Sequence, residues 1–310
     1  MRILLTNDDG IRAPGIIALF EALAGHHPEF DGPILGKDTK VFVVAPETVQ
    51  SATSHGVTFH EPLMTRDVQV TDEMAGIAVD GRPADCVKLA LSTLWPEHFG
   101  KGNPLPDLVV SGMNAGANAG VNVIYSGTVA AAIEAAFLGV PSIAVSLHLG
   151  HHRPLFEVAS GHARRAIEAI LRSGPLERHE CLSINIPRTE ELLPRDVARP
   201  GPFGSRLGPT GPDAEETLPS DYDPTIMPPI RVCPMNTHGL IDKYERRVSP
   251  SGDVYYWAAG DGLAFFETDR GTDVHELFDR AITVTPLSYD LTRQGAMGRW
   301  RDRLAGHDRK

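Results

Sequence analysis

Two adjacent carboxylates near the start of the chain, Asp8 and Asp9, are the residues best suited to do chemistry. They follow a short apolar run at residues 3–6 and stand directly before Gly10. Side chains alternate between faces within a strand, but the chain turns towards Gly10, so both carboxylates can point at one place. There they repel each other unless a cation neutralises them. An isolated Asp-Asp-Gly is often only a turn, but its position after an apolar strand favours a metal site.

Two further polar residues occupy comparable positions. Ser51 lies in the loop after the apolar run 41–45, and Asn114 follows the apolar run 108–111. In an open α/β sheet the carboxyl ends of the strands lie along one edge, where ligands bind. A loop serine is more often a turn residue than a ligand, but carboxylate, amide and hydroxyl oxygens together suit Mg²⁺, Mn²⁺ or Ca²⁺. The sequence therefore predicts one divalent metal ion, bound by Asp8, Asp9, Ser51 and Asn114.

A segment of small residues, 111–120, allows the backbone to approach a ligand closely and to present amide N–H groups to an anion. Shortly after it, Ser126 is a natural N-cap for an alanine-rich helix whose positive end favours a phosphate. The alternative is a flexible loop followed by an ordinary cap. We expect phosphate or substrate contacts from Asn7, Gly112, Asn118, Ser126, Gly127 and Thr128.

These parts predict hydrolysis of a phosphomonoester, with Asp8 and Asp9 as the catalytic carboxylates. Spacing does not decide which of them acts as base or nucleophile. His55, close to Ser51, is a candidate to assist the phosphate or the leaving group. Other sites fit less well. The His151-His152 pair lacks a zinc-ligand spacing, the haloacid-dehalogenase phosphatases use Asp-x-Asp, and a GxxxxGK[ST] loop does not occur.

The apolar runs alternate with helical patterns, which predicts parallel βαβ units in a Rossmann-like, doubly wound, mostly parallel α/β sheet. We expect a catalytic domain over residues 1–187, with extra strands at 57–63 and 76–79, a helix opened by Pro83 and a late strand at 183–186. Residues 188–229 form a Pro- and Gly-rich insertion. Residues 230–310 are expected to supply β-hairpins and a C-terminal arm for subunit contacts, from strands at 244–247, 254–257 and 282–284 with a turn at 249–252.

Composition narrows the class of protein. A formal net charge of -11 argues against a general nucleic-acid or anionic-membrane surface. The three cysteines are far apart and odd in number, which favours neither a disulfide framework nor a metal knuckle. The chain carries neither a secretory leader pattern nor an apolar run long enough for a membrane span. We therefore expect a cytoplasmic protein.

Four blocks of sequence resemble the SurE survival-protein nucleotidases: ILLTNDDG at 3–10, VVAPETVQSATSHGVT at 43–58, VDGRPADCVKLAL at 79–91 and PDLVVSGMNAGANAGVNVIYSGTVAAAIEAAFLG at 106–139. Weaker similarity lies at 182–187 and 282–292. The family's metal ligands fall on the four residues named above. The resemblance implies hydrolysis of nucleoside 5′- and 3′-monophosphates with Mg²⁺ or Mn²⁺, polyphosphate as a secondary substrate in some members, and homodimers or homotetramers built through hairpins and an exchanged C-terminal arm.

The chain departs from the family pattern in two places. Val49 and Gln50 stand where a basic pair usually precedes the ligand serine, so attraction for phosphate is weaker or comes from elsewhere. The insertion is also longer than in most members. If it blocks turnover, the same fold would be a metal-dependent nucleotide-binding module. A structural Rossmann-like protein with a chance Asp-Asp-Gly is the remaining alternative, and it requires four accidental blocks.

Overall fold

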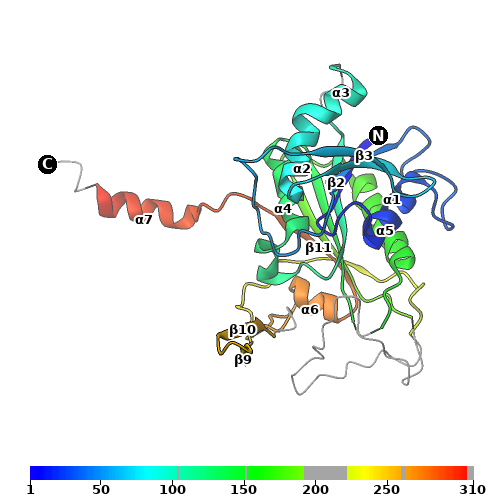
Figure 1. Cartoon of the computed structure of the whole chain (residues 1–310). Coiled ribbons are helices and arrows are strands. Elements are labelled where there is room, and N and C mark those ends of the chain that lie inside the picture. Colours follow the sequence, from blue (N-terminus) through cyan, green and yellow to red (C-terminus); the bar gives the residue numbers. More distant parts are fainter. Residues whose placement is uncertain (103–104, 151, 192–221, 260–262, 306–310) are drawn as a thin grey trace.

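The structure is a computed structural model that describes residues 1–102, 105–150, 152–191, 222–259 and 263–305. One large twisted sheet forms the centre, with helices on both faces (Figure 1). Within the described residues, no helix has both the length and the apolar character needed to cross a lipid bilayer. His151 and most of the insertion, residues 192–221, lie outside the described residues.

The central sheet has nine strands in the order β3-β4-β2-β1-β5-β6-β7-β11-β8. Neighbouring strands from β4 to β7 run parallel, whereas β3 pairs with β4 and β11 with β7 in antiparallel fashion. The predicted Rossmann-like, mostly parallel sheet is thus confirmed. Its strands are β1 (Arg2–Thr6), β2 (Lys40–Pro46), β3 (Thr65–Gln69), β4 (Ala75–Val79), β5 (Leu108–Ala115), β6 (Ser142–Leu147), β7 (Cys181–Ile186), β8 (Ile230–Val232) and β11 (Ile282–Leu287).

Two apolar layers hold the helices on the sheet. Helices α1 (Pro14–Ala24) and α5 (Phe156–Ser173) cover one face, where Leu19 and Ile167 pack with Ile3. Helices α2 (Pro83–Leu89) and α4 (Gly127–Phe137) cover the other face. The central strands are buried on both sides, which explains why their sequences are almost uninterrupted apolar runs.

Helix boundaries follow local sequence chemistry. Pro14 and Pro83 each start a helix, where the missing N–H of proline costs nothing. Gly25 ends α1 in the left-handed conformation. After α2 the chain continues through a π-helical turn (Ala90–Leu94) and α3 (Trp95–Phe99), and a 3₁₀ turn (Gly120–Ile124) precedes α4.

The strand expected at residues 57–63 is wrong. That stretch is irregular, and the strand that forms a hairpin with β4 is β3, which begins at Thr65. The reason lies in its contacts: Asp85 accepts hydrogen bonds from the backbone N–H and the hydroxyl of Thr58, at 2.8 and 2.7 Å, so this segment is tied to α2 and not to a strand. Sequence alone shows only that the segment is β-prone.

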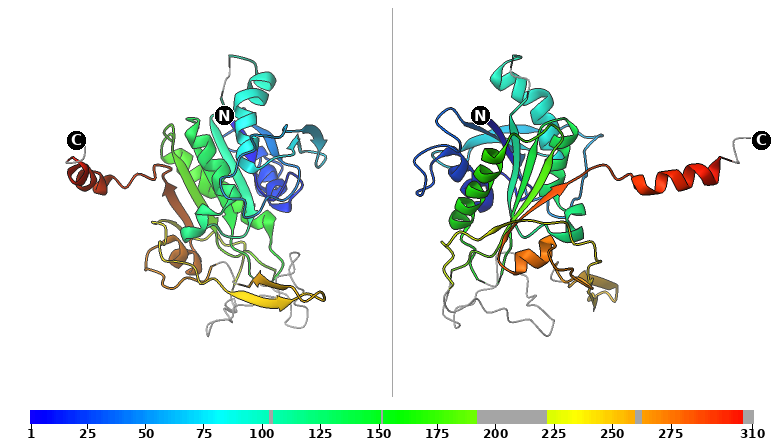
Figure 2. Two further views of the ribbon diagram at one scale, coloured as in Figure 1. Left: turned by 60° about the vertical axis from the view of Figure 1, so that its left-hand side comes forward. Right: turned by 180° about the vertical axis from the view of Figure 1, so that it is seen from behind.

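The C-terminal region is only partly the predicted arm. The predicted hairpin exists as β9 (Tyr244–Val248) and β10 (Val254–Ala258), and it stands away from the body (Figure 2). In contrast, β11 and β8 join the main sheet, so residue 187 does not mark the end of that sheet. Helix α6 (Asp273–Phe278) precedes β11. An unpredicted helix, α7 (Gln294–Leu304), extends outwards near the C-terminus (Figure 1).

Candidate metal centre

Asp8 lies just past the end of β1, in a turn that its neighbours hold in place. Asn7 donates a hydrogen bond from Nδ2 to the carbonyl oxygen of Gly10 at 2.9 Å. Gly10 has a φ of 95°, a conformation that favours glycine. The backbone N–H of Gln50 donates to the carbonyl oxygen of Asp8 at 2.7 Å, which brings the loop after β2 to this turn. Asp8 is only 4% exposed, so its carboxylate is well shielded from bulk water.

The N-terminus of α4 abuts Asp8. The Ser126 hydroxyl accepts a hydrogen bond from the N–H of Val129 at 3.1 Å, which confirms Ser126 as the N-cap. The hydroxyl of Thr128 donates to Oδ1 of Asp8. A side chain at Gly127 would place its Cβ 2.8 Å from the Cβ of Asp8, so only glycine fits there. The positive N-terminal end of this helix therefore lies against the Asp8 carboxylate, whose negative charge it favours.

Asp9 is joined to β5. The backbone N–H of Ala115 donates to Oδ2 of Asp9 at 2.9 Å, which places Asn114 beside this carboxylate. The Asn114 side chain donates from Nδ2 to the carbonyl oxygen of Gly116 at 2.6 Å, and its Oδ1 is then the atom suited to a metal. Strand β5 runs four residues further than the expected end at Ser111, with a register irregularity between Ser111 and Asn114. This irregularity brings Asn114 to the site.

The loop that carries Ser51 follows β2 and contacts the Asp8 turn through Gln50. Ser51 itself is exposed. Ala52 and Ser54 have φ angles of 57° and 53°, a left-handed conformation that costs roughly 1–3 kcal/mol for each such residue. Ser54 donates from its backbone N–H to the carbonyl oxygen of Tyr125 at 3.1 Å. The loop is therefore held against the segment that leads into α4.

The electrostatics of the two carboxylates favour a bound cation. Burial raises the pKa of Asp8 to about 6, against the opposing hydrogen bond from Thr128, and the neighbouring charge of Asp9 adds to the rise. Burial also raises the pKa of Asp9, opposed by the hydrogen bond from Ala115. Both groups thus resist ionisation without a counter-ion. A divalent cation removes this cost by pairing with both charges.

The available donor atoms fit a hard metal ion. Among the residues that the structure describes, no three or more His, Cys, Asp and Glu side chains gather in a way that could hold a metal. A metal here must therefore combine the two carboxylates with neutral oxygens, and Asn114 and Ser51 supply an amide and a hydroxyl. Such a set suits Mg²⁺ or Mn²⁺ and does not suit a thiolate-seeking ion.

Some residues expected to contact phosphate have structural partners. A Cβ at Gly112 would lie 2.2 Å from the carbonyl oxygen of Val145, so this glycine allows close packing on β6. Asn118 donates from Nδ2 to the hydroxyl of Ser146 at 2.9 Å and from its backbone N–H to Asn185 at 2.8 Å. These contacts hold the loop after β5. Direct contact of Gly112 or Asn118 with a substrate stays a prediction.

A buried carboxylate on α4, Glu134, was missed by the sequence reasoning. It is 4% exposed and accepts hydrogen bonds from His55 Nε2 at 2.7 Å and Lys88 Nζ at 3.0 Å. Burial opposes its ionisation, but these hydrogen bonds outweigh burial and lower the pKa of Glu134. The sequence did contain a signal for it, since Glu134 is the single charged residue of an alanine-rich helix. A charge on the buried face of such a helix needs hydrogen-bond or ion-pair partners.

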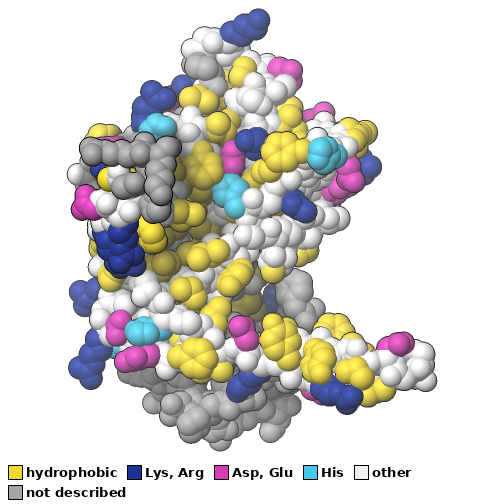
Figure 3. Space-filling view, turned by 90° about the vertical axis from the view of Figure 1, so that its left-hand side faces the viewer, with side chains coloured by type: hydrophobic (Ala, Val, Ile, Leu, Met, Phe, Trp, Pro, Cys, Tyr) yellow, Lys and Arg dark blue, Asp and Glu magenta, His cyan; other side chains and the backbone are white. Residues whose placement is uncertain are grey.

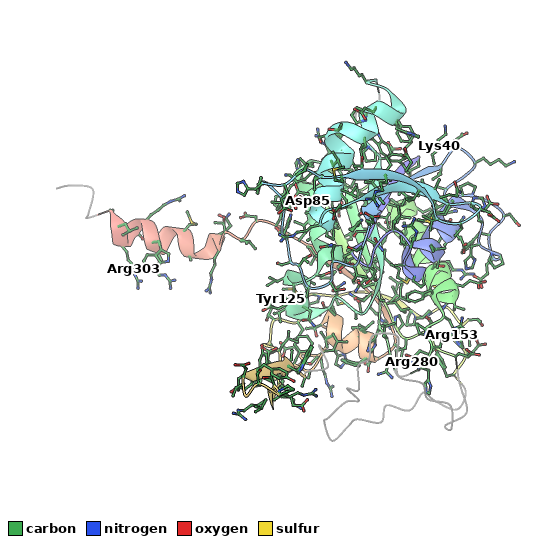
Figure 4. All side chains as sticks on the ribbon, viewed as in Figure 1. Lys40, Asp85, Tyr125, Arg153, Arg280 and Arg303 are labelled. Atoms are coloured by element: carbon green, nitrogen blue, oxygen red, sulfur yellow. The ribbon has the colours of Figure 1, made fainter. Side chains whose placement is uncertain are left out.

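Two labelled residues mark the part of the surface along which the Ser51 loop runs. In Figure 4, Asp85 on α2 and Tyr125 before α4 are labelled on the same side of the body, along the path of the Ser51 loop. Figure 3 shows the β9–β10 hairpin projecting at lower right, with the surface hollowed between it and the body. Tyr125 is 58% exposed and so lies at the outer surface.

Comparisons with known proteins find similar sequences along nearly the whole chain. Residues 3–201 match the family model described as survival protein SurE. The chain is 37% identical to a 5′-nucleotidase SurE of Syntrophobacter fumaroxidans, over 97% of this chain and 99% of that protein. It is 38% identical to a 5′-nucleotidase SurE of Rhodopirellula baltica, over 97% and 98% of the two chains.

A solved structure shares the whole architecture. The crystal structure of the SurE protein from Aquifex aeolicus matches with a TM-score of 0.68 and 30% sequence identity, and the match covers 98% of this chain and 99% of that one. The resemblance drawn from the four sequence blocks is thus confirmed along nearly the full length. The chain belongs to the SurE family.

Proposed function

We propose that this protein hydrolyses nucleoside 5′-monophosphates to nucleoside and phosphate, with one Mg²⁺ or Mn²⁺ ion per subunit. The observation that carries the proposal is the pairing of Asp8 and Asp9 at the sheet edge, next to Asn114 and the Ser51 loop. The relatives named 5′-nucleotidase SurE support the substrate class. Nucleoside 3′-monophosphates are proposed as further substrates.

The chain's own residues have separable roles in this proposal. Asp8, Asp9, Ser51 and Asn114 would hold the metal, which when bound supplies Lewis-acid polarisation of the phosphoryl group and a more acidic water. Thr128 fixes the orientation of the Asp8 carboxylate through its hydroxyl. The first turn of α4 adds a positive field where the phosphate charge is to be placed. Val49 and Gln50 are uncharged, so in this proposal the attraction for phosphate comes from this field and the metal and not from that pair.

The test is release of inorganic phosphate from a panel of nucleoside 5′- and 3′-monophosphates with Mn²⁺, with Mg²⁺ or with a chelator. We expect metal-dependent release that is lost in Asp9→Asn, while the exposed Asp72→Asn serves as a matched control with unchanged rates. If the folded protein binds nucleotide by calorimetry but releases no phosphate with either metal, the binding-module alternative replaces the enzyme.

We also propose that the protein forms a homodimer or homotetramer. Helix α7 carries Met297, Trp300 and Leu304 at helical spacing, and they are 38%, 50% and 54% exposed. The β9–β10 hairpin exposes further aromatic side chains, including Trp257 at 58%. Such apolar surfaces usually mark contacts between proteins. Light scattering should show an oligomer that Trp300→Asp weakens, and a monomeric wild type would contradict the proposal. A cytoplasmic location stays a prediction.

A further inference from the structure

The loop of residues 50–58 is anchored at several points along its length. Its Ser54 hydroxyl donates to the carbonyl oxygen of Ile124 at 2.8 Å, and Thr53 donates back to the carbonyl oxygen of Gln50 at 2.8 Å. At the far end, Thr58 is bound by Asp85. Between these anchors, His55 reaches across to Glu134 on α4. The loop therefore has a defined shape although Ser51 is exposed.

His55 is bound in two ways. Its Nε2 donates to the Glu134 carboxylate, which as an ionised group can only accept. Its ring stacks on Phe137, with centroids 5.2 Å apart and an angle of 12° between the planes. Glu134 is in turn held by Lys88 of α2. His55, Glu134 and Lys88 thus link the Ser51 loop, α4 and α2, the three elements that surround Asp8 on this side.

The backbone conformation explains why the loop needs such a link. Ala52 and Ser54 adopt left-handed φ angles although neither is glycine. Residues in this conformation persist only where surrounding contacts fix them, and they cluster at functional sites. Both strained positions lie between Ser51 and His55. Gln50, next to Ser51, is bound to the Asp8 carbonyl oxygen, so we expect loss of the His55 anchor to loosen the part of the loop that carries the Ser51 hydroxyl.

We propose that His55 is a positioning residue, which through its hydrogen bond to Glu134 holds the Ser51 hydroxyl at the metal site. The inference rests on the proposed metal-dependent function. It gives His55 a different role from the sequence-based hypothesis of assisting the phosphate or the leaving group, since Nε2 donates to Glu134. The effect of His55 on the metal is indirect and passes through Ser51.

The experiment measures Mn²⁺ affinity directly, from the electron paramagnetic resonance signal of free Mn²⁺, without substrate. The proteins are wild type, His55→Phe, Ser51→Ala and the double variant. Phenylalanine keeps the stacked ring and removes the hydrogen bond. We expect His55→Phe to weaken binding about tenfold, the effect of losing one charge-assisted hydrogen bond. In the Ser51→Ala background, the same change should weaken binding by less than about twofold, because coupled residues are not additive.

The controls separate folding from positioning. His60→Ala removes an exposed histidine five residues after His55 and should leave Mn²⁺ binding unchanged. Thermal melts without metal establish that each variant is folded, and Glu134→Gln gives a second route to the same loss if His55→Phe does not fold. Equal affinity in wild type and His55→Phe, or a full tenfold effect in the Ser51→Ala background, overturns the inference. A wild type that binds no Mn²⁺ overturns the proposed metal site together with it.

Discussion

The hydroxyl of Thr128 donates its hydrogen bond to Oδ1 of Asp8, so the first turn of α4 ends on the carboxylate proposed to bind the metal. Both residues are buried: Thr128 is fully buried, and Asp8 is 4% exposed. The contact joins residues that are 120 positions apart in the chain. It connects the stability of the fold with the proposed chemistry of the site, because the carboxylate proposed to bind the metal is also costly to bury.

Replacing Thr128 with valine keeps the shape of the side chain and removes its hydroxyl. A buried charge that loses one hydrogen bond costs about 1.5–3 kcal/mol. We therefore expect Thr128→Val to lower the rate of phosphate release about tenfold. The acidic limb of the pH–rate profile should move to higher pH, because the lost hydrogen bond no longer lowers the pKa of Asp8. The exposed Thr93→Val is the control and should behave as wild type. An unchanged profile in Thr128→Val would show that the hydroxyl has no bearing on Asp8.

Replacing Asp8 with asparagine should stabilise the metal-free protein while it abolishes activity. The rise of the Asp8 pKa from 3.8 to about 6 corresponds to about 3 kcal/mol of unfavourable ionisation at neutral pH. A buried amide needs partners of its own, so we expect a net gain of about 1–2 kcal/mol in the free energy of unfolding. Urea titration at pH 8 with chelator measures it. No gain over wild type would mean that the Asp8 charge is already compensated.

The same pKa predicts how metal binding depends on pH. In the metal-free protein the folded state holds the Asp8 proton more tightly than the unfolded state. Asp8 therefore contributes stability that is fully present below about pH 4 and is lost as the pH rises to about 6. Mn²⁺ must displace this proton, so its affinity should rise with pH up to about 6 and then level off. Binding titrations between pH 5 and pH 8 test this, and an affinity that does not change across the range would contradict it.

The sequence predicted the strand ends and the helix cap around Asp8 better than the periphery of the fold. Asp8, Asp9 and the Ser126 cap follow from strand ends and capping chemistry, which act over a few residues. The antiparallel pairing of β11 with β7 was not predictable, because the apolar pattern of Ile282 and Val284 gives a strand but not its partner. Glu134 was missed for a similar reason, since its partners come from two other segments.

Gly127 tests how tightly α4 is placed against Asp8. In Gly127→Ala the new Cβ would lie 2.8 Å from the Cβ of Asp8 and 3.1 Å from Cγ of Pro83, so either the helix or the carboxylate must move. We expect a loss of at least tenfold in metal affinity, or about 1.4 kcal/mol. The matched control is Gly298→Ala in α7, where a Cβ meets open space. A Gly127→Ala variant with normal Mn²⁺ binding would show that the first turn of α4 can shift freely.

Acid sensitivity of the fold should depend on His148, which lies just beyond the end of β6, two strands along the sheet from β1. Its ring is 6% exposed and packs edge-on against Phe278 at 5.3 Å. Burial, helped by the charge of Arg188, lowers the pKa of His148 to about 3. The unfolded chain takes up a proton near pH 6.5, whereas the folded protein does not, so stability is present above this pH and is lost as the pH falls.

His148→Phe removes this proton uptake and keeps an aromatic ring against Phe278. Between pH 6.5 and pH 4.5 we expect wild type to lose about 2 kcal/mol more than the variant in the free energy of unfolding. Other titrating groups, Asp8 included, contribute equally to both proteins and cancel in the difference. Urea titrations at the two pH values, with His60→Ala as the exposed-histidine control, give the comparison. If wild type and His148→Phe lose stability in parallel, His148 must become protonated within the folded protein, and its ring is then less shielded from water than the packing indicates.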